Sequence, residues 1–146
     1  MKINIATLFP EMCEAVVNTS IIGRAKAAGK IDVEVFNIRD YTLNKHKNVD
    51  DTPYGGGHGM VMQTQPIYDC CKAIEAKSTS KPFVIFTTAA GRVFNQELAI
   101  ELSQRKTSQL CAVIMKALTK GLLKKLPIWK FQSVILCSQV ASCRRW

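Results

Sequence analysis

The residue types best suited to chemistry are concentrated in one glycine-rich segment, NVDDTPYGGGHGMVMQTQP, at positions 48–66. Four of the five residues at positions 55–59 are glycines, which let the backbone adopt positive φ angles and let another molecule approach the main chain closely. The amides of such a segment could donate hydrogen bonds to a phosphate group or to the edge of a nucleic-acid base. Asp50 and Asp51 precede the glycines, and the basic cluster Lys45, His46 and Lys47 lies just upstream.

A simpler interpretation of this segment stays open. Its spacing fits neither a phosphate-binding GK[ST] loop nor a GxGxxG turn, so composition alone also allows a plain flexible loop. His46 and His58 are isolated histidines, and such residues are more often solvated loop side chains than catalysts. The flanking carboxylates and the basic cluster favour a functional segment, because a loop of this length is uncommon inside a compact domain.

The spacing of apolar residues predicts an α/β fold with a mostly parallel sheet flanked by helices. Strands are expected at 2–9, 31–38, 81–88 and 108–114, which are short, apolar and rich in β-branched residues. Helices are expected over 11–30, with breaks at Gly23 and Gly29, over 66–77, and within 89–106 after a turn that contains Gly91. A long loop at 40–65 holds the glycine-rich segment. Strands that alternate with helices imply parallel pairing through crossovers.

The six cysteines predict buried thiols rather than disulfides or a metal site. Their spacing is irregular and no signal peptide precedes them, so we expect a reduced, cytoplasmic setting. Cys70 and Cys71 are neighbours on a predicted helix, where their side chains diverge by about 100° and cannot bind one metal ion together. No metal-binding residue is therefore predicted.

The charge of the chain changes abruptly after Cys111. The 146 residues are 47% apolar, which suits one globular domain, and their net charge of +9 by itself favours a polyanionic partner. Residues 1–111 hold thirteen Lys and Arg together with all eleven acids, whereas residues 112–146 hold seven bases and no acid. We therefore divide the chain into residues 1–111 and a divergent basic tail, residues 112–146.

Part of this tail can be drawn as a basic amphipathic helix. The stretch MKALTKGLLKKL at 115–126 places Lys116, Lys120 and Lys124 four residues apart, with leucines beside them, before Pro127. Such a pattern is typical of a helix that binds a membrane surface or a partner, and this alternative function stays open. No apolar run reaches the roughly 18–20 residues that span a bilayer, so no membrane span is expected.

Several motifs together resemble the bacterial tRNA (guanine-N1)-methyltransferases that modify the guanine at tRNA position 37. They are LFPEM at 8–12, IIGRA at 21–25, RDYT at 39–42 and the highly specific VDDTPYGGGHGM at 49–60, which QP follows at 65–66. The resemblance runs from Met1 to Cys111. It implies an S-adenosylmethionine-dependent enzyme of the trefoil-knotted SPOUT class, acting on tRNA rather than DNA as a cytoplasmic homodimer.

The resemblance also implies site residues. The family's glycine-rich loop contacts tRNA near the target guanine, and its positions in this chain, together with the arginine of IIGRA, are Arg24, Asp50, Tyr54, Gly55, Gly56, Gly57, His58 and Gly59. The first cofactor loop of the family follows the third strand and corresponds to Thr87, Thr88, Ala89 and Gly91. The family usually has a Ser/Thr-Pro pair where this chain has Thr88 and Ala89, and loss of that proline leaves the loop less rigid.

The tail departs from the family, which continues with CGHYEGFDER and then a MEISIGDFVLTGGELPAM-like stretch. A change of reading frame accounts for the departure. Residues 115–121 can be encoded by ATG AAG GCT TTG ACG AAA GGN, and regrouping these bases one position earlier, with a preceding T, gives codons for YEGFDER. Residues 128–146 regroup in the same way to MEISVGDFVLTGGELPAM. We therefore predict a frameshift at the codon of Cys111.

The frameshift sets what this chain is expected to do. In the family a linker Asp removes the N1 proton and a downstream Arg polarises O6, and both lie beyond Cys111, so no catalytic residue is assigned. The knot is expected to be incomplete. We expect a truncated family member that binds S-adenosylmethionine weakly or not at all and transfers no methyl group by itself. A non-catalytic RNA-binding remnant, in which the glycine-rich segment and Arg24 still contact tRNA, remains an alternative.

Overall fold

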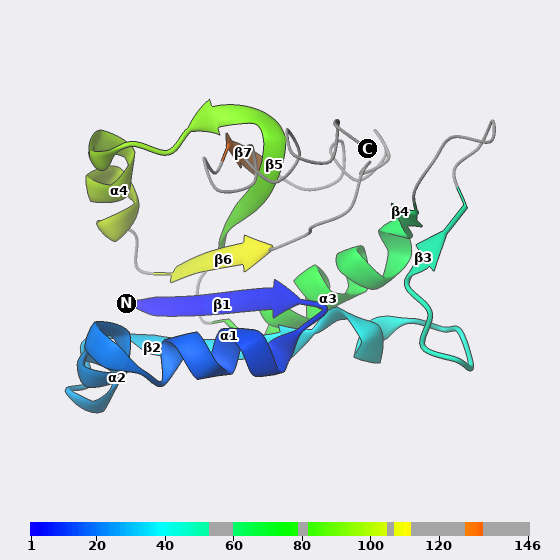
Figure 1. Ribbon diagram of the computed structural model, residues 1–146, viewed down its shortest axis with the longest axis horizontal. Coiled ribbons are helices and arrows are strands. Elements are labelled where there is room, and N and C mark those ends of the chain that lie inside the picture. The colour runs from blue at the N-terminus through cyan, green and yellow to red at the C-terminus, as the bar shows by residue number, and fades with distance from the viewer. Residues whose placement is uncertain (53–59, 79–81, 105–106, 112–127, 133–146) are drawn as a thin grey trace, which may run out of the picture.

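A parallel β-sheet forms the centre of the molecule. The computed structural model describes residues 1–52, 60–78, 82–104, 107–111 and 128–132. The sheet has the order β2–β1–β6–β5–β7 and every pairing in it is parallel (Figure 1). In that order the strands are Asp32–Asn37, Lys2–Thr7, Thr107–Cys111, Phe83–Val93 and Ile128–Gln132. The predicted α/β fold with a mostly parallel sheet is therefore confirmed.

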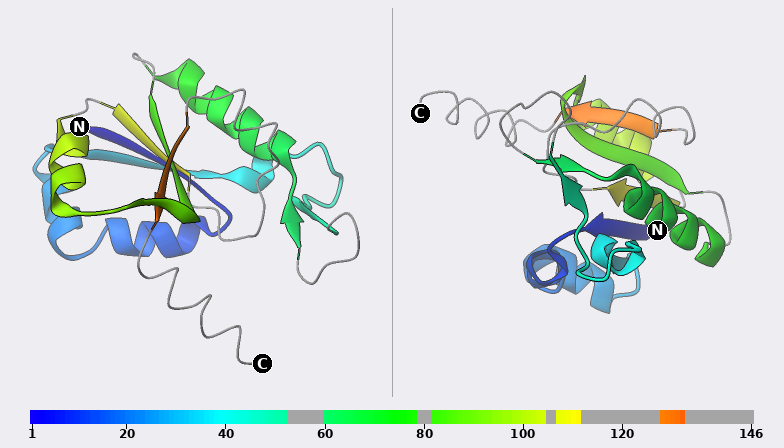
Figure 2. Two further views of the ribbon diagram at one scale, coloured as in Figure 1. Left: turned by 90° about the horizontal axis from the view of Figure 1, so that it is seen from above. Right: turned by 90° about the vertical axis from the view of Figure 1, so that its right-hand side faces the viewer.

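Helices cover both faces of the sheet, because each crossover between parallel strands has to pass over one face. Between β1 and β2 the chain forms α1 (Pro10–Val17) and α2 (Ser20–Ala27). The helix α3 (Thr64–Lys77) lies between β2 and β5 in the sequence, and α4 (Gln96–Ser103) lies between β5 and β6. Figure 2 shows α1 and α2 on one side of the sheet and α3 on the other. The described chain therefore forms three layers.

The expected helix over 11–30 is divided at Asn18 and Thr19, not at Gly23. Gly23 lies inside α2, so the predicted break there is wrong. A Cβ at this position would stand only 2.5 Å from the carbonyl oxygen of Asn18, which explains why the sequence has glycine here. Gly29 does follow the end of α2, with a φ of 68° that favours glycine.

Several other boundaries differ from the expected ones. The predicted loop at 40–65 contains short regular elements, namely the end of the 3₁₀ helix η1 (Ile38–Tyr41) and the strands β3 (Asp50–Asp51) and β4 (Val61–Met62). Helix α3 begins two residues earlier than expected, at Thr64. The strand expected at 108–114 is β6, and residues 112–114 lie outside the described chain, as does the amphipathic helix expected at 115–126. The sequence did not predict β7.

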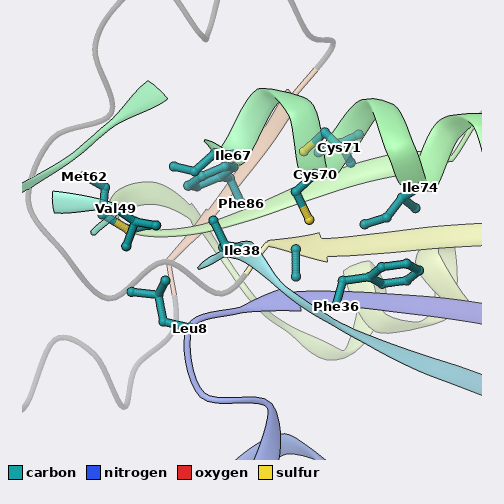
Figure 3. Close-up of a cluster of buried hydrophobic side chains, with 12 residues drawn as sticks. Leu8, Phe36, Ile38, Val49, Met62, Ile67, Cys70, Cys71, Ile74 and Phe86 are labelled. Atoms are coloured by element: carbon teal, nitrogen blue, oxygen red, sulfur yellow. The ribbon is translucent and has the colours of Figure 1, made fainter. Parts of the chain in front are cut away.

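Alternate residues of β5 pack on opposite faces of the sheet, as the two-residue period of a strand requires. Val84 and Phe86 belong to a large buried cluster on the α3 side, which also contains Phe36 and Ile38 (Figure 3). Ile85 packs instead with Leu98 of α4. The α3 residues of the large cluster are Ile67, Cys70, Cys71 and Ile74. Burial of Cys70 and Cys71 agrees with their prediction as structural thiols.

Candidate functional site

The two ends of the glycine-rich segment pair in a short antiparallel ladder. Asp50 of β3 pairs with Met62 of β4, and Asp51 pairs with Val61. One residue below the ladder, the amide of Gln63 donates a hydrogen bond of 2.8 Å to the carbonyl oxygen of Val49. At the top, the amide of Thr52 donates to the carboxylate of Asp51 at 2.8 Å. The ladder therefore holds together the two strands that enter and leave residues 52–60.

Two buried side chains tie this ladder to the core. Val49 is 1% exposed and Met62 is 2% exposed, and both belong to the large cluster on the α3 side. Figure 3 shows them at one end of that cluster, with Ile74 at the other end. These anchors are not predictable from periodicity, because single apolar residues at the ends of a polar stretch have none. Their position on either side of that stretch was the only available signal.

Side-chain hydrogen bonds order the segment upstream of β3. The side chain of Asn37 accepts from the amide of Arg39 at 3.0 Å and so caps η1. Thr42 Oγ1 donates to the carbonyl oxygen of Asn48 at 3.0 Å, and Arg39 Nη1 donates to that of Lys47 at 3.5 Å. These contacts fix the path of the chain from the end of β2 to the start of β3.

The basic cluster upstream of the glycines lies on the surface of this segment. Lys45, His46 and Lys47 are all exposed. Lys47 Nζ lies 3.3 Å from Asp40 Oδ1, in an exposed pair that stabilises the fold by little. Within the described chain, Lys45 and His46 have no ion-pair partner. The charge of Lys45 therefore faces solvent beside the ladder, where it could attract an anionic ligand.

The two predicted tRNA-binding residues that the structure describes, Arg24 and Asp50, lie far apart within one chain. Asp50 is half-buried on β3, whereas Arg24 is exposed on α2. Figure 1 shows α2 and the β3–β4 ladder at opposite ends of the molecule. The other predicted tRNA contacts, Tyr54, Gly55, Gly56, Gly57, His58 and Gly59, lie outside the described residues.

The predicted cofactor turn lies inside a strand, which corrects the expected end of the third strand. Strand β5 continues from Phe83 to Val93 and so contains Thr87, Thr88, Ala89 and Gly91. The cause is pairing with β7: Thr87 and Arg92 of β5 both align with Phe131, so the intervening residues 88–91 form an irregularity in the ladder. The predicted cofactor residues thus lie at an interruption of the β5–β7 pairing, and their binding role stays a prediction.

Burial suppresses ionisation of the acidic groups nearest the core. Burial raises the pKa of the Cys70 thiol to about 12, and the charges of Cys71 and Asp40 add to the effect. The pKa of Tyr41 is also raised, mainly by burial and then by Cys70, Asp40 and Glu34. Both groups are therefore neutral near pH 7 and cannot act there as bases.

Among the described residues, no group of three or more His, Cys, Asp or Glu side chains is arranged to hold a metal ion. No described helix has the length and apolar character needed to cross a bilayer.

Comparison with known proteins identifies relatives of one kind. The family model described as tRNA (Guanine-1)-methyltransferase TrmD matches residues 1–119. A tRNA (guanine-N(1)-)-methyltransferase of Clostridium perfringens is 58% identical over 106 residues, and that of Clostridium beijerinckii is 56% identical over the same length. These alignments cover 73% of this chain but only 44% and 43% of the respective relatives, so the chain spans less than half of their length.

A solved structure gives the same result. The crystal structure of tRNA (m1G37) methyltransferase from Aquifex aeolicus superposes with a TM-score of 0.81 at 25% identity, covering 96% of this chain and 66% of that one. The resemblance inferred from the VDDTPYGGGHGM motif is thus confirmed by sequence and by fold. The chain belongs to the TrmD family of tRNA (guanine-1)-methyltransferases.

Proposed function

We propose that residues 1–111 are the N-terminal part of an S-adenosylmethionine-dependent enzyme that methylates N1 of the guanine at tRNA position 37. The family match over residues 1–119 is the observation that carries this proposal. Its tRNA-binding element is the segment between β3 and β4. The anchored ladder supports this assignment, because it holds Asp50 and both ends of the glycine-rich segment on a rigid core. A tRNA substrate also makes the cytoplasm the setting we propose.

Methyl transfer to guanine N1 requires a base for the N1 proton, a partner for O6 and a methyl donor aligned with the nitrogen. S-adenosylmethionine supplies the methyl group in the full-length reaction. The cofactor contacts of Thr87, Thr88, Ala89 and Gly91 stay a prediction; these residues lie at the irregularity in the β5–β7 pairing. No described residue is assigned as the base, and we derive no step through the cofactor in this chain.

We propose that this chain by itself transfers no methyl group. The acid-free tail stands where the family has its remaining cofactor loops, and it regroups in a second reading frame to the family's YEGFDER and MEISVGDFVLTGGELPAM motifs. Isothermal titration of the chain with S-adenosylmethionine tests the proposal. We expect no binding in the micromolar range, and micromolar binding would refute it.

Recognition of tRNA is tested by comparing two tRNAs that differ only in the base at position 37. We expect the chain to prefer the tRNA with guanine there, and the preference should persist as added salt weakens both affinities. The tail's positive charge could itself attract any RNA. A matched variant with Gln at Lys116, Lys120, Lys124 and Lys125 removes much of that charge but keeps β7. Equal affinity of this variant for both tRNAs would contradict a specific site.

We propose homodimerisation through the outer face of α1 and α2. Helix α2 has no buried residue, and α1 buries only Val17. Large apolar side chains are nevertheless exposed on both helices, notably Met12 at 69% and Ile21 at 70%, together with Val16 and Ile22. Exposed apolar side chains gathered in this way are typical of an interface. A second copy that covered them would supply the burial that α2 lacks.

A further inference from the structure

The ladder formed by the two ends of the glycine-rich segment is too short to be stable alone. It has two residue pairs, Asp50 with Met62 and Asp51 with Val61. A two-stranded ladder of any length is at best marginally stable in water. The position of the ladder must therefore be fixed by contacts that lie outside it.

Among the described residues, one pair of contacts with the hydrophobic core can do this. Met62 belongs to β4 and Val49 directly precedes β3, and both side chains are almost completely buried. No other residue between Thr42 and Gln63 that the structure describes is classed as buried. These two side chains are thus the only points at which this part of the described chain enters the core.

The hydrophobic cluster that contains Val49 and Met62 also contains Phe86, the residue directly before the predicted cofactor residues. Phe86 is 1% exposed, belongs to the same cluster and directly precedes Thr87 in β5. Figure 3 shows Val49 and Met62 at the end of the cluster formed by Ile38, Ile67 and Phe86. Because protein interiors are close-packed, a void beneath the ladder would let its base shift relative to β5.

We propose that Val49 and Met62 are positioning residues that hold Asp50 and the β3–β4 ladder, and with them the two ends of the tRNA-binding segment, in a fixed place on the core. This inference rests on the proposed function. The side chains need not touch tRNA. They act through Asp50 and the two ends of the glycine-rich segment, and a fixed placement of the bound guanine is what methyl transfer requires.

The test compares alanine substitutions at the two ends of the same buried cluster. Met62→Ala removes the anchor, whereas Ile74→Ala removes a side chain of similar size from the far end of the same cluster, on α3. We expect Met62→Ala to weaken binding of the guanine-37 tRNA about tenfold and to reduce the preference for guanine. Ile74→Ala should change affinity less than about twofold despite a comparable loss of stability. Met62→Leu should restore affinity.

The outcomes separate this inference from the proposed function. If the unaltered chain shows no preference for guanine at position 37, the proposed function fails. If it shows the preference and Met62→Ala retains it, or if Ile74→Ala is equally harmful, the positioning role alone fails.

Hydrogen exchange on the unaltered chain gives a second test, which decides the matter if Met62→Ala does not fold. The amide of Gln63, which donates to the carbonyl oxygen of Val49, should be protected nearly as well as those of α3, because the anchors make the ladder part of the same cooperative unit. Rapid exchange of the Gln63 amide beside a protected α3 would overturn the proposal.

Discussion

The backbone of Gly23 lies so close to the end of α1 that an added Cβ would stand 2.5 Å from the carbonyl oxygen and 2.8 Å from the carbonyl carbon of Asn18. The same residue donates its amide to the carbonyl oxygen of Thr19 at 3.0 Å, at the start of α2. Glycine is therefore required by the tight junction of two helices. Arg24 is the next residue of α2, so the position of its side chain depends on this junction.

Gly23→Ala is expected to push α2 away from α1 and to lower the free energy of unfolding by about 1–3 kcal/mol. It should also weaken tRNA binding, because Arg24 moves with the helix. Gly29→Ala is the matched control: its φ of 68° is strained for alanine, but no atom lies within 4 Å of the added carbon. Urea unfolding and tRNA titration of both variants measure these effects. Tighter tRNA binding by Gly23→Ala would contradict the role of the junction.

The buried thiol of Cys70 gives the fold a dependence on alkaline pH. Its pKa is about 12 in the folded chain and 9.0 in the unfolded chain, so between these values only the unfolded state loses the proton. The contribution to stability is complete below pH 9 and is lost as pH rises toward 12, by up to about 1.4 kcal/mol per pH unit. Thermal unfolding should show this slope for the native chain and a smaller slope for Cys70→Ala. Equal slopes would contradict it.

At the scale of elements, the outer face of α1 and α2 is the interface that we propose for a homodimer. Met12 and Val16 are four residues apart, so they lie on one face of α1, and both are exposed. We expect Met12→Lys with Val16→Lys to convert a dimer into a monomer in sedimentation equilibrium. Leu43→Lys is the control, because Leu43 is 86% exposed but lies away from these helices, between η1 and β3. A native chain that is monomeric at high concentration would contradict the proposed interface.

Elements with a strong local pattern were predictable from sequence. The runs that form β1 and β2 alternate or are uniformly apolar, and α3 has apolar residues at helical spacing that all face one cluster. The extension of β5 through Gly91 and the strand β7 were not predictable, because each exists only through pairing with a segment far away in the sequence. The break at Asn18 was missed for a different reason: glycine is normally the helix breaker, so the break was expected at Gly23.

The residues of the candidate site were predictable from sequence, but the buried residues that hold them in place were not. The glycine-rich segment and its Asp50 were identified by residue type and spacing. The anchors Val49 and Met62 could not be identified, because their role depends on a core assembled from β2, α3 and β5. Separation of Arg24 from Asp50 at opposite ends of the molecule likewise follows from topology, which places α2 and the ladder in different crossovers.

At the scale of the whole molecule, the tail differs from the rest of the chain in charge, yet part of it belongs to the same sheet. Residues 112–146 carry seven bases and no acid, unlike any other stretch of this length in the chain. One short part of them, β7, nevertheless pairs in parallel with β5 at the edge of the sheet. An apolar stretch such as IWKFQ can add to an exposed strand edge whatever its coding origin, since the ladder uses only backbone groups.

The central claim is that the chain follows the family to Cys111 and continues in another reading frame. Determining the DNA sequence that encodes residues 111–146 tests it most directly. We predict that a second frame in that DNA encodes GHYEGFDER opposite residues 112–121 and MEISVGDFVLTGGELPAM opposite residues 128–146. Codons whose second frames encode neither motif would contradict the account.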